Sequence, residues 1–423
     1  MQFNNVFTII FLVFLFLSMI IKLILDIINY KHRKKNKNKI PHELEGLIDQ
    51  NKLLKINNYS NEQLTFSLIE YFFDKIFILI ILFTGLIPIY YDFLRAITLN
   101  VYLLALLFFW GFLIIQIIFD IPFSLYFNFL IEKKYQFNKM TAGIWIMDLI
   151  KKIVLTFVLS TIILIPLVFF VYKFENIWWL LLWTFFLLFS LIIQIFYPTV
   201  IAPLFNKFKS LNDLELKNKI EKLAKDTGFK LKGIFEMDAS KRSTHSNAYF
   251  TGIGKTKRIV LFDSLLQKHS HEEILSILAH EIGHYKHKHV IKNLLISSIT
   301  SLIGLFIGFL LINNRYLYEA FGFKNNIDVI NIKFIGLFLL IIISDPISFF
   351  LNPFQSYISR KFEYQADKYS AKILKTTEYL IDSLKKLNID NLSNIYPADI
   401  YAWFYYSHPP LFKRIRALKN YRS

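Results

Sequence analysis

Residues 101–128 read VYLLALLFFWGFLIIQIIFDIPFSLYFN, and Asp120 is the single charged residue among them. A helix needs roughly 20 consecutive apolar residues to cross the hydrocarbon core of a bilayer. This run is long enough, and it therefore predicts a membrane-spanning helix.

Six more apolar runs of similar length occur along the chain. The composition agrees with a membrane environment, because 55% of the residues are hydrophobic and 19% are charged, whereas soluble domains average about 25% charged residues. The sequence thus predicts a multi-pass α-helical membrane protein with seven spans. The other runs lie near 6–25, 71–91, 153–172, 177–197, 294–312 and 334–351.

The first apolar run predicts a retained helix and not a removed signal peptide. It has neither a basic segment before it nor a small-residue cleavage site, and a basic stretch at 31–39 follows it. The positive-inside rule then places the N-terminus outside or in a lumen. Seven crossings place the C-terminus in the cytoplasm, and the membrane would be a bacterial inner membrane or the endoplasmic reticulum.

The formal charge of +18 raises the question of a nucleic-acid partner. Most Lys and Arg residues fall in the four segments that this topology places in the cytoplasm, so the basicity follows from topology and needs no nucleic acid. These segments are 31–70, 129–152, 198–293 and 352–423. The chain also has no Cys, so a metal would have to bind through His, Asp or Glu.

One predicted helix carries the chemistry. Residues 270–273 (SHEE) fit a capping box, so the helix is expected to begin at Ser270. It contains the run HEIGH at 280–284. Residues four apart share a helical face, so His280 and His284 can bind one zinc ion while Glu281 reaches its water.

A third ligand has to come from elsewhere in the chain. The metzincin pattern is excluded because His287 and Val290 stand where it needs Gly and His. The intramembrane site-2 pattern is also excluded, because the motif lies on a polar helix and no Asp-Gly follows Asn352-Pro353. Glu363 is the preferred third ligand, and Asp367, one turn later, could accept the outer N–H of a zinc-bound His.

These motifs divide the chain into four parts. Residues 1–197 form a membrane region with five transmembrane helices, and residues 294–351 add two more. Residues 198–293 form the first part of a catalytic domain and residues 352–423 its second part. Within 198–293 we expect a helix at 213–227 ended by Gly228, strands at 231–237, 246–250 and 258–262, and a turn marked by Gly252 and Gly254.

At this point the sequence resembles the gluzincin metallopeptidases, and among them the integral-membrane CAAX prenyl protease 1 family. The resemblance spans most of the chain. It is densest at 132–141 (EKKYQFNKMT), 197–208 (YPTVIAPLFNKF), 240–250 (SKRSTHSNAYF), 280–289 (HEIGHYKHKH), 359–367 (SRKFEYQAD) and 406–410 (YSHPP). It implies a seven-helix barrel that encloses a water-filled chamber, with a gluzincin-like zinc peptidase domain and a small β-sheet at the cytoplasmic end.

The resemblance also implies roles for single residues. His280, His284 and Glu363 would bind one Zn²⁺ per chain, and Glu281 would be the catalytic base. Asn247, Ala248 and Tyr249 would belong to an edge strand that pairs with an extended peptide substrate, and His408 would stabilise the tetrahedral intermediate. Two departures from the family pattern, Tyr285 in place of Trp and His287, do not touch a ligand position.

The function implied is zinc-dependent removal of the last three residues of a prenylated C-a-a-X protein. A broader role in membrane-protein quality control is the alternative enzyme function. A non-catalytic channel or scaffold with structural zinc is disfavoured because Glu281 would then have no task. Either enzyme function implies a peptide or protein substrate and the lipid bilayer as partners.

Several remaining features have simpler interpretations. Gly254-Lys255-Thr256 resembles the end of a phosphate-binding loop, but Tyr249 stands where the first Gly belongs, so we expect a turn and no nucleotide. Polar residues within the spans are expected to face an interior cavity, namely Gln116, Asp120, Gln194 and Asp345. The remaining histidines near the motif are expected to be solvated or to support the ligands from behind, namely His269, His271, His287 and His289.

Overall fold

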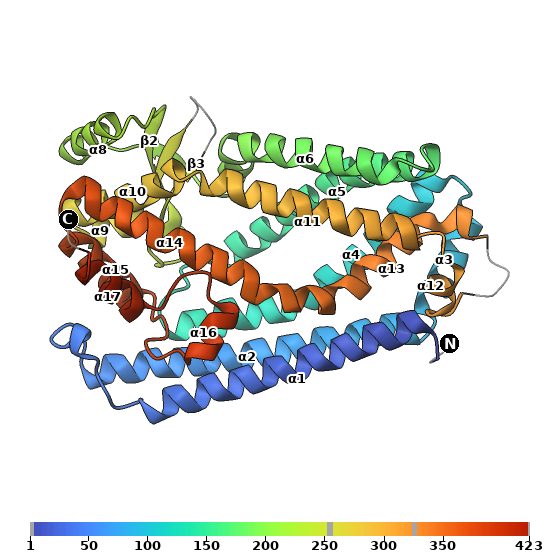
Figure 1. The fold of residues 1–423 in the computed structure, drawn as a ribbon, viewed down its shortest axis with the longest axis horizontal. Helices are drawn as coiled ribbons and strands as arrows, with labels where there is room; N and C mark the ends of the chain where they lie inside the picture. Colours follow the sequence, from blue (N-terminus) through green and yellow to red (C-terminus); the bar gives the residue numbers. More distant parts are fainter. Residues whose placement is uncertain (1–3, 252–256, 324–327, 422–423) are drawn as a thin grey trace.

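The computed structural model describes residues 4–251, 257–323 and 328–421. Long helices run along the length of the molecule, and the two termini lie at opposite ends (Figure 1). Among the described residues six helices are long and apolar enough to cross a membrane, or seven when one bent pair is taken as a span. The helices at the membrane are α1 (Val6–Lys35), α2 (Gln50–Phe83), α3 (Leu86–Ile97), α4 (Val101–Tyr126), α5 (Ala142–Lys173), α6 (Trp178–Phe196), α11 (His289–Leu311) and α13 (Lys333–Ser348).

The second span is broken, which the apolar run at 71–91 did not predict. Helix α2 ends at Phe83, Gly85 adopts a left-handed conformation with φ +81°, and α3 leaves at an angle of 60°. Glycine enters that conformation without the steric cost that a side chain adds. Hydropathy alone does not reveal such a bend, because the residues on both sides of it are equally apolar.

The membrane helices bury little of their surface inside the protein. Between 6% and 39% of the residues in their apolar windows are buried. A compact bundle would bury one whole face of each helix, so the low burial agrees with helices that surround a hollow barrel.

The buried apolar core of the barrel lies at the end where the N-terminus is found, away from the C-terminus (Figure 1). We call this cluster the apolar plug. It joins the start of α1 to the end of α2, to α3 and to α12 (Arg315–Glu319) with the residues after it. Its members include Phe11, Leu82, Tyr91, Phe108, Val171, Trp178 and Phe321.

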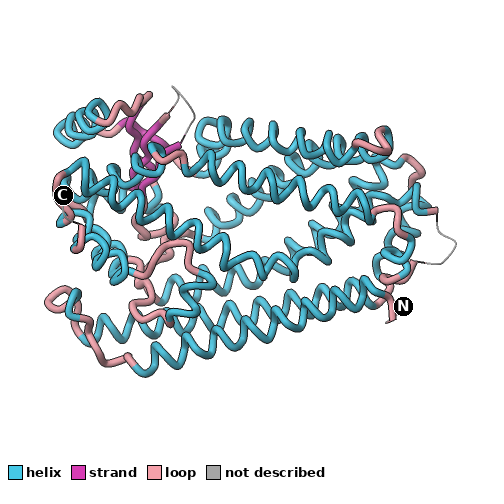
Figure 2. Tube along the Cα trace, in the orientation of Figure 1, coloured by secondary structure: helices cyan, strands magenta, loops and turns pink. Residues whose placement is uncertain are grey.

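The β-sheet lies at the opposite end from the plug (Figure 2). Its strand order is β1-β2-β4-β3, with β2 parallel to β4 and the other two pairs antiparallel. The predicted strands are present, with shorter bounds in two cases, and β1 was not predicted. The strands are β1 (Phe208–Ser210), β2 (Gly233–Met237), β3 (Ala248–Thr251) and β4 (Arg258–Phe262).

Two strand details matter for the site. Strand β3 begins at Ala248, so Asn247 lies just before it and not within it as expected. Strand β3 pairs with β4 alone and therefore forms an edge of the sheet. The turn predicted at Gly252 and Gly254, and the stretch Gly254-Lys255-Thr256, lie outside the described residues.

The predicted helix starts are confirmed. Ser270 caps α10 (His271–Lys286) through a complete capping box with Glu273, and Asp213 caps α8 (Leu214–Asp226), which ends before Gly228 at φ +60°. The other helices are α7 (Ala202–Phe205), α9 (Asp263–Lys268), α14 (Asn352–Leu374), α15 (Glu378–Asp390), α16 (Asp399–Tyr405) and α17 (Leu411–Lys419). Short 3-10 or π turns are η1 (His42–Leu44), η2 (Phe127–Glu132), η3 (Tyr197–Ile201), η4 (Ala239–Lys241), η5 (Val329–Ile332) and η6 (Phe349–Leu351).

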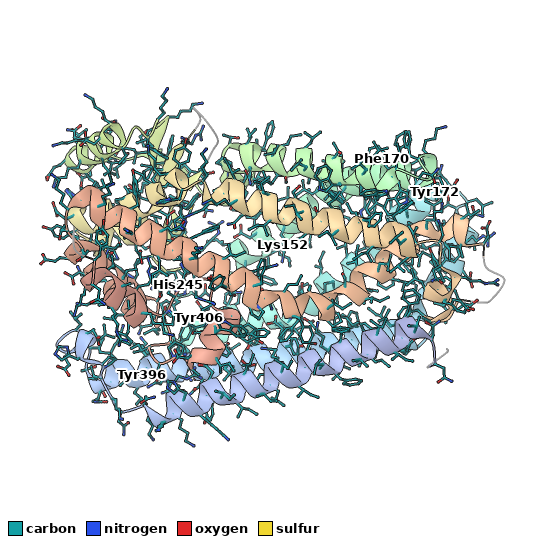
Figure 3. The ribbon with its side chains drawn as sticks, viewed as in Figure 1. Lys152, Phe170, Tyr172, His245, Tyr396 and Tyr406 are labelled. Atoms are coloured by element: carbon teal, nitrogen blue, oxygen red, sulfur yellow. The ribbon has the colours of Figure 1, made fainter. Side chains whose placement is uncertain are left out.

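Three of the four polar residues expected to face an interior cavity have polar partners, and one of them lines a cavity. Lys75 of α2 and Asp345 of α13 form an ion pair of 2.6 Å, and Gln116 donates a hydrogen bond to Asp120 within α4. Asp120 also lines a cavity of about 400 Å³ together with Asp148 and Lys152 of α5, and Lys152 is labelled in Figure 3. The spans thus present polar groups to a cavity.

Candidate metal centre

The site forms where α10 and α14 pack closely against each other. Gly283 makes this approach possible, because a Cβ there would lie 2.9 Å from the Cα of Ala366 and 3.1 Å from its carbonyl oxygen. The HEIGH run of α10 and the Glu363–Asp367 turn of α14 therefore face each other. In the sequence, α10 and α14 are separated by α11, α12 and α13.

His280, His284 and Glu363 come together at this crossing. Each offers one ligand atom, and these atoms all lie within 4.8 Å of one another. The Nε2 atoms of the two imidazoles are 3.1 Å apart. Glu363 Oε1 lies 3.2 Å from Nε2 of His284, and Oε2 lies 3.5 Å from Nε2 of His280.

These separations fit a tetrahedral zinc ion. With Zn–ligand distances of about 2.0–2.1 Å, the ligand atoms of a tetrahedral site lie about 3.3–3.4 Å apart. Glu363 is itself 5% exposed, and a carboxylate buried this deeply needs cationic partners. Two imidazoles and one carboxylate are one of the donor sets found at catalytic zinc sites.

Asp367 holds the imidazole of His280 at Nδ1, the ring nitrogen that is not a proposed ligand atom. Its Oδ1 lies 2.8 Å from Nδ1 of His280, which orients the ring so that Nε2 faces His284 and Glu363. Burial alone would lower the pKa of His280, but its hydrogen bonds with Asp367 and Glu363 outweigh burial and raise the pKa to about 9. The negative surroundings that hold this proton would equally favour a metal cation.

Arg414 of α17 is a buried cation that the sequence did not single out. It donates to both carboxylate oxygens of Asp367, at 2.9 and 2.6 Å, and its Nη1 lies 3.4 Å from Glu363 Oε2. One sequence signal was present: Arg is rare in this Lys-rich chain, and Arg is preferred over Lys where a buried carboxylate is held by two hydrogen bonds.

His408 also reaches the site. It lies between α16 and α17, and its Nδ1 is 2.8 Å from Glu363 Oε2 while its side chain remains 66% exposed. Glu281 is half-buried and interacts electrostatically with Arg414. His408 thus contacts a proposed metal ligand, and the roles of His408 and Glu281 stay predictions.

The expected substrate strand lies beside the motif helix, because α10 packs against β3. Asn247 is exposed, and its backbone carbonyl oxygen accepts a hydrogen bond from the backbone amide of Phe262. This bond fixes the chain where β3 begins. Ala248 is buried and Tyr249 is half-buried. The role of these three residues in substrate binding also stays a prediction.

The four histidines near the motif that are not proposed ligands differ in their surroundings. His289 is buried against His284, and the exposed His287 stacks on His289. The half-buried His271 pairs with Asp213 at 2.9 Å. His269 is buried beside Glu273, so His269 and His289 are more enclosed than a solvated role would require.

Two family models match consecutive parts of the chain. The model described as CAAX prenyl protease N-terminal, five membrane helices, matches residues 29–207. The model described as Peptidase family M48 matches residues 210–422.

Relatives cover nearly the whole chain. A CAAX prenyl protease 1 homolog of Arabidopsis thaliana is 37% identical over 90% of this chain and 90% of its own length. The CAAX prenyl protease 1 of Saccharomyces cerevisiae is 34% identical over 92% of this chain and 90% of its own length. The chain belongs to the CAAX prenyl protease 1 family of M48 peptidases.

A solved structure extends this finding to the fold. The crystal structure of S. mikatae Ste24p superposes with a TM-score of 0.89 at 31% identity, covering 98% of this chain and 99% of that one. As an M48 peptidase this chain is a metallopeptidase, and its apolar helices make it an integral multi-pass membrane protein. The resemblance seen in the sequence, the seven-span barrel fold and the enzyme class are thereby confirmed.

Proposed function

We propose that this M48 peptidase is a zinc-dependent endopeptidase that removes the C-terminal tripeptide from prenylated C-a-a-X proteins. One observation carries the metal assignment: His280, His284 and Glu363 converge at tetrahedral spacing, and Asp367 holds the outer nitrogen of His280. The printed names of the relatives support the substrate class. A substrate whose lipid anchor stays in the bilayer suits an enzyme built into the same membrane.

Zinc at this site would supply a Lewis acid that polarises the scissile carbonyl and makes water acidic near neutral pH. Glu281 would take the proton from the attacking water and pass it to the leaving amine, which is the task of a general base followed by a general acid. His408 would donate a hydrogen bond to the oxygen that becomes negative. Arg414 and Asp367 would keep the ligand set oriented through the reaction.

Substrate would bind as an added strand along β3. Edge strands leave their outer N–H and C=O groups free for a peptide backbone. Asn247, Ala248 and Tyr249 stand at this edge and next to α10. The peptide would thus be held in an extended form with its scissile bond towards Glu281.

We further propose that the catalytic domain faces the cytoplasm and the N-terminus the outside or a lumen. The ends of the chain lie at opposite ends of the barrel, and most of the basic residues lie in the segments assigned to the cytoplasm. On this proposal 198–293 and 352–423 form one domain across the α10–α14 contact. The two membrane parts 1–197 and 294–351 form the barrel.

The test uses the purified full chain with a farnesylated C-a-a-X peptide and the same peptide without the lipid. We expect chelator-sensitive release of the tripeptide from the farnesylated peptide, restored by added zinc. Cleavage that persists in chelator would overturn the metal assignment. Equal cleavage of both peptides would instead favour the broader role in membrane-protein quality control.

A further inference from the structure

His284 has a support of its own that differs from the support of His280. Its Nδ1 lies 3.0 Å from Nδ1 of His289, and the Nε2 of His289 lies 2.8 Å from Oε1 of Gln365. Nδ1 of His280 faces the carboxylate of Asp367. Nδ1 of His284 instead faces a chain of hydrogen-bonded neutral side chains, His289 and Gln365. Asp367 and Arg414 take no part in that chain.

His289 is held in one place by its surroundings. It is 2% exposed, and its ring stacks on Phe362 of α14 with centroids 4.0 Å apart and planes within 9°. Lys288 before it has a left-handed conformation with φ +57°, and this turn ends α10 and begins α11 with His289. The imidazole is thus enclosed between the metal site and α14.

Metal binding by His284 determines which ring nitrogen of His284 and of His289 carries a proton. When Nε2 of His284 binds a metal, its Nδ1 must carry the proton and donate it. Nδ1 of His289 is then the acceptor, so the proton of this neutral ring lies on Nε2. Oε1 of Gln365 is an acceptor and can receive that proton.

We propose that His289 is a positioning residue for the metal ligand His284, with Gln365 fixing its tautomer. The inference rests on the proposed metal site and adds a second, uncharged support to it. His289 is also the first residue of α11, and Gln365 lies on α14. The chain His284–His289–Gln365 therefore joins the metal site to a helix of the membrane barrel.

The experiment measures zinc affinity of the purified full chain by competition with a chromogenic chelator, with no peptide present. His289→Phe keeps a ring against Phe362 and removes the acceptor, and we expect zinc binding about 10–100-fold weaker, as for other residues that support a zinc ligand. His289→Asn places an oxygen near the position of Nδ1 and is expected to restore affinity to within about threefold. Gln365→Leu should show an intermediate loss.

His287→Phe is the matched control, because His287 stacks on His289 with centroids 5.5 Å apart but is exposed. We expect its zinc affinity to match the wild type. Thermal unfolding of the metal-free variants in detergent shows whether they remain folded.

Unchanged affinity in a folded His289→Phe variant would overturn the inference and leave the proposed peptidase intact. A loss in both His289→Phe and His289→Asn would also overturn it, since packing and not the hydrogen bond would then be responsible. A wild-type chain that binds no zinc would overturn the proposed metal site together with this inference.

Discussion

Glu281 is the proposed base of the chemical step, and it is not a ligand in the proposed site. Because Glu281→Gln keeps the size of the side chain and removes the base, we expect peptide cleavage to fall by about 10²–10⁴-fold while zinc stays bound. Metal analysis and cleavage of a farnesylated peptide measure the two properties separately. Glu272→Gln, which changes a carboxylate at the start of the same helix, should remain active, and near-normal cleavage by Glu281→Gln would show that another group is the base.

Arg414 holds Asp367 by two hydrogen bonds, so its proposed effect on the metal site depends on geometry as well as on charge. Lys at this position would keep the charge but could not donate to both carboxylate oxygens in one plane. We expect Arg414→Lys to weaken zinc binding on the order of tenfold. Arg416→Lys changes an exposed residue of the same helix and should bind zinc as the wild type does; equal affinities for both variants would contradict the role given to Arg414.

His245, labelled in Figure 3, is a titrating group that lies between Glu132 and Asn391. Its Nε2 lies 3.2 Å from Glu132 Oε2 and its Nδ1 3.0 Å from Asn391 Oδ1. Burial alone would lower its pKa, but these two acceptors outweigh burial and raise the pKa above the ordinary value. Since both ring nitrogens face oxygen atoms, the charged imidazolium is the form that satisfies them.

The sign of the pH effect follows from this raised pKa. A group with a raised folded-state pKa stabilises the fold fully below its unfolded pKa, about 6.5 for His, and loses that contribution as pH rises through the folded value. We expect His245→Gln to lower the melting temperature more at about pH 6 than at about pH 9. The exposed His42→Gln serves as the control, and a difference that grows with pH would contradict the assignment.

The sequence allowed part of this site to be predicted. The spacing of His280, Glu281 and His284 follows from one turn of helix, and Glu363 and Asp367 share the same spacing on another. The contacts of Arg414 and His289 could not be predicted this way, because they depend on how the helices pack. Arg414 lies 134 residues from His280 in sequence, and no local pattern reports such a contact.

At the scale of elements, the contact between α10 and α14 depends on one missing side chain. A Cβ at Gly283 would meet backbone atoms of Ala366, which cannot rotate away as a flexible side chain can. We expect Gly283→Ala to separate the helices, to destabilise the fold by about 1–3 kcal/mol and to lower zinc affinity. Melting temperature and chelator competition measure these two effects.

Gly304 of α11 provides the matched control, because a Cβ there has no neighbour within 4 Å. Gly304→Ala should be neutral or slightly stabilising, since Ala favours a helix. Wild-type stability and zinc affinity in Gly283→Ala would show that the close approach is not required.

Element boundaries were predictable where capping chemistry marks them. Ser270 with Glu273 marked the start of α10, and Asp213 with the Gly228 stop marked both ends of α8. The three-residue strand β1 and the break between α2 and α3 were not predictable, because short pairing and helix direction depend on neighbours. Helices α1 and α5 likewise extend beyond the apolar runs that revealed them.

At the scale of the whole molecule, the absence of native Cys makes the proposed topology directly testable. Leu99, between α3 and α4, and Leu214, at the start of α8, are both exposed, by 79% and 71%. In sealed vesicles with the cytoplasmic face outward, an impermeant thiol reagent should label Leu214→Cys at once. Leu99→Cys should react only after detergent is added, and the reverse pattern would contradict the orientation.

Composition and hydropathy predicted the number of spans, but not the hollow arrangement of the helices. Nothing in a run of apolar residues says whether its faces meet lipid, a cavity or another helix. The family resemblance supplied the barrel, and the low burial of the spans agrees with it. The position of the apolar plug at one end could be known only from the assembled helices.

The apolar plug has a consequence for the cell as well as for the fold. A hollow, water-bearing barrel open at both ends would conduct ions and dissipate the electrical potential across its membrane. Phe11, Phe108 and Phe321 are completely buried at the closed end, where dry, close-packed side chains present a high barrier to a hydrated ion. The plug would therefore let the bilayer remain an electrical insulator around a barrel that encloses water.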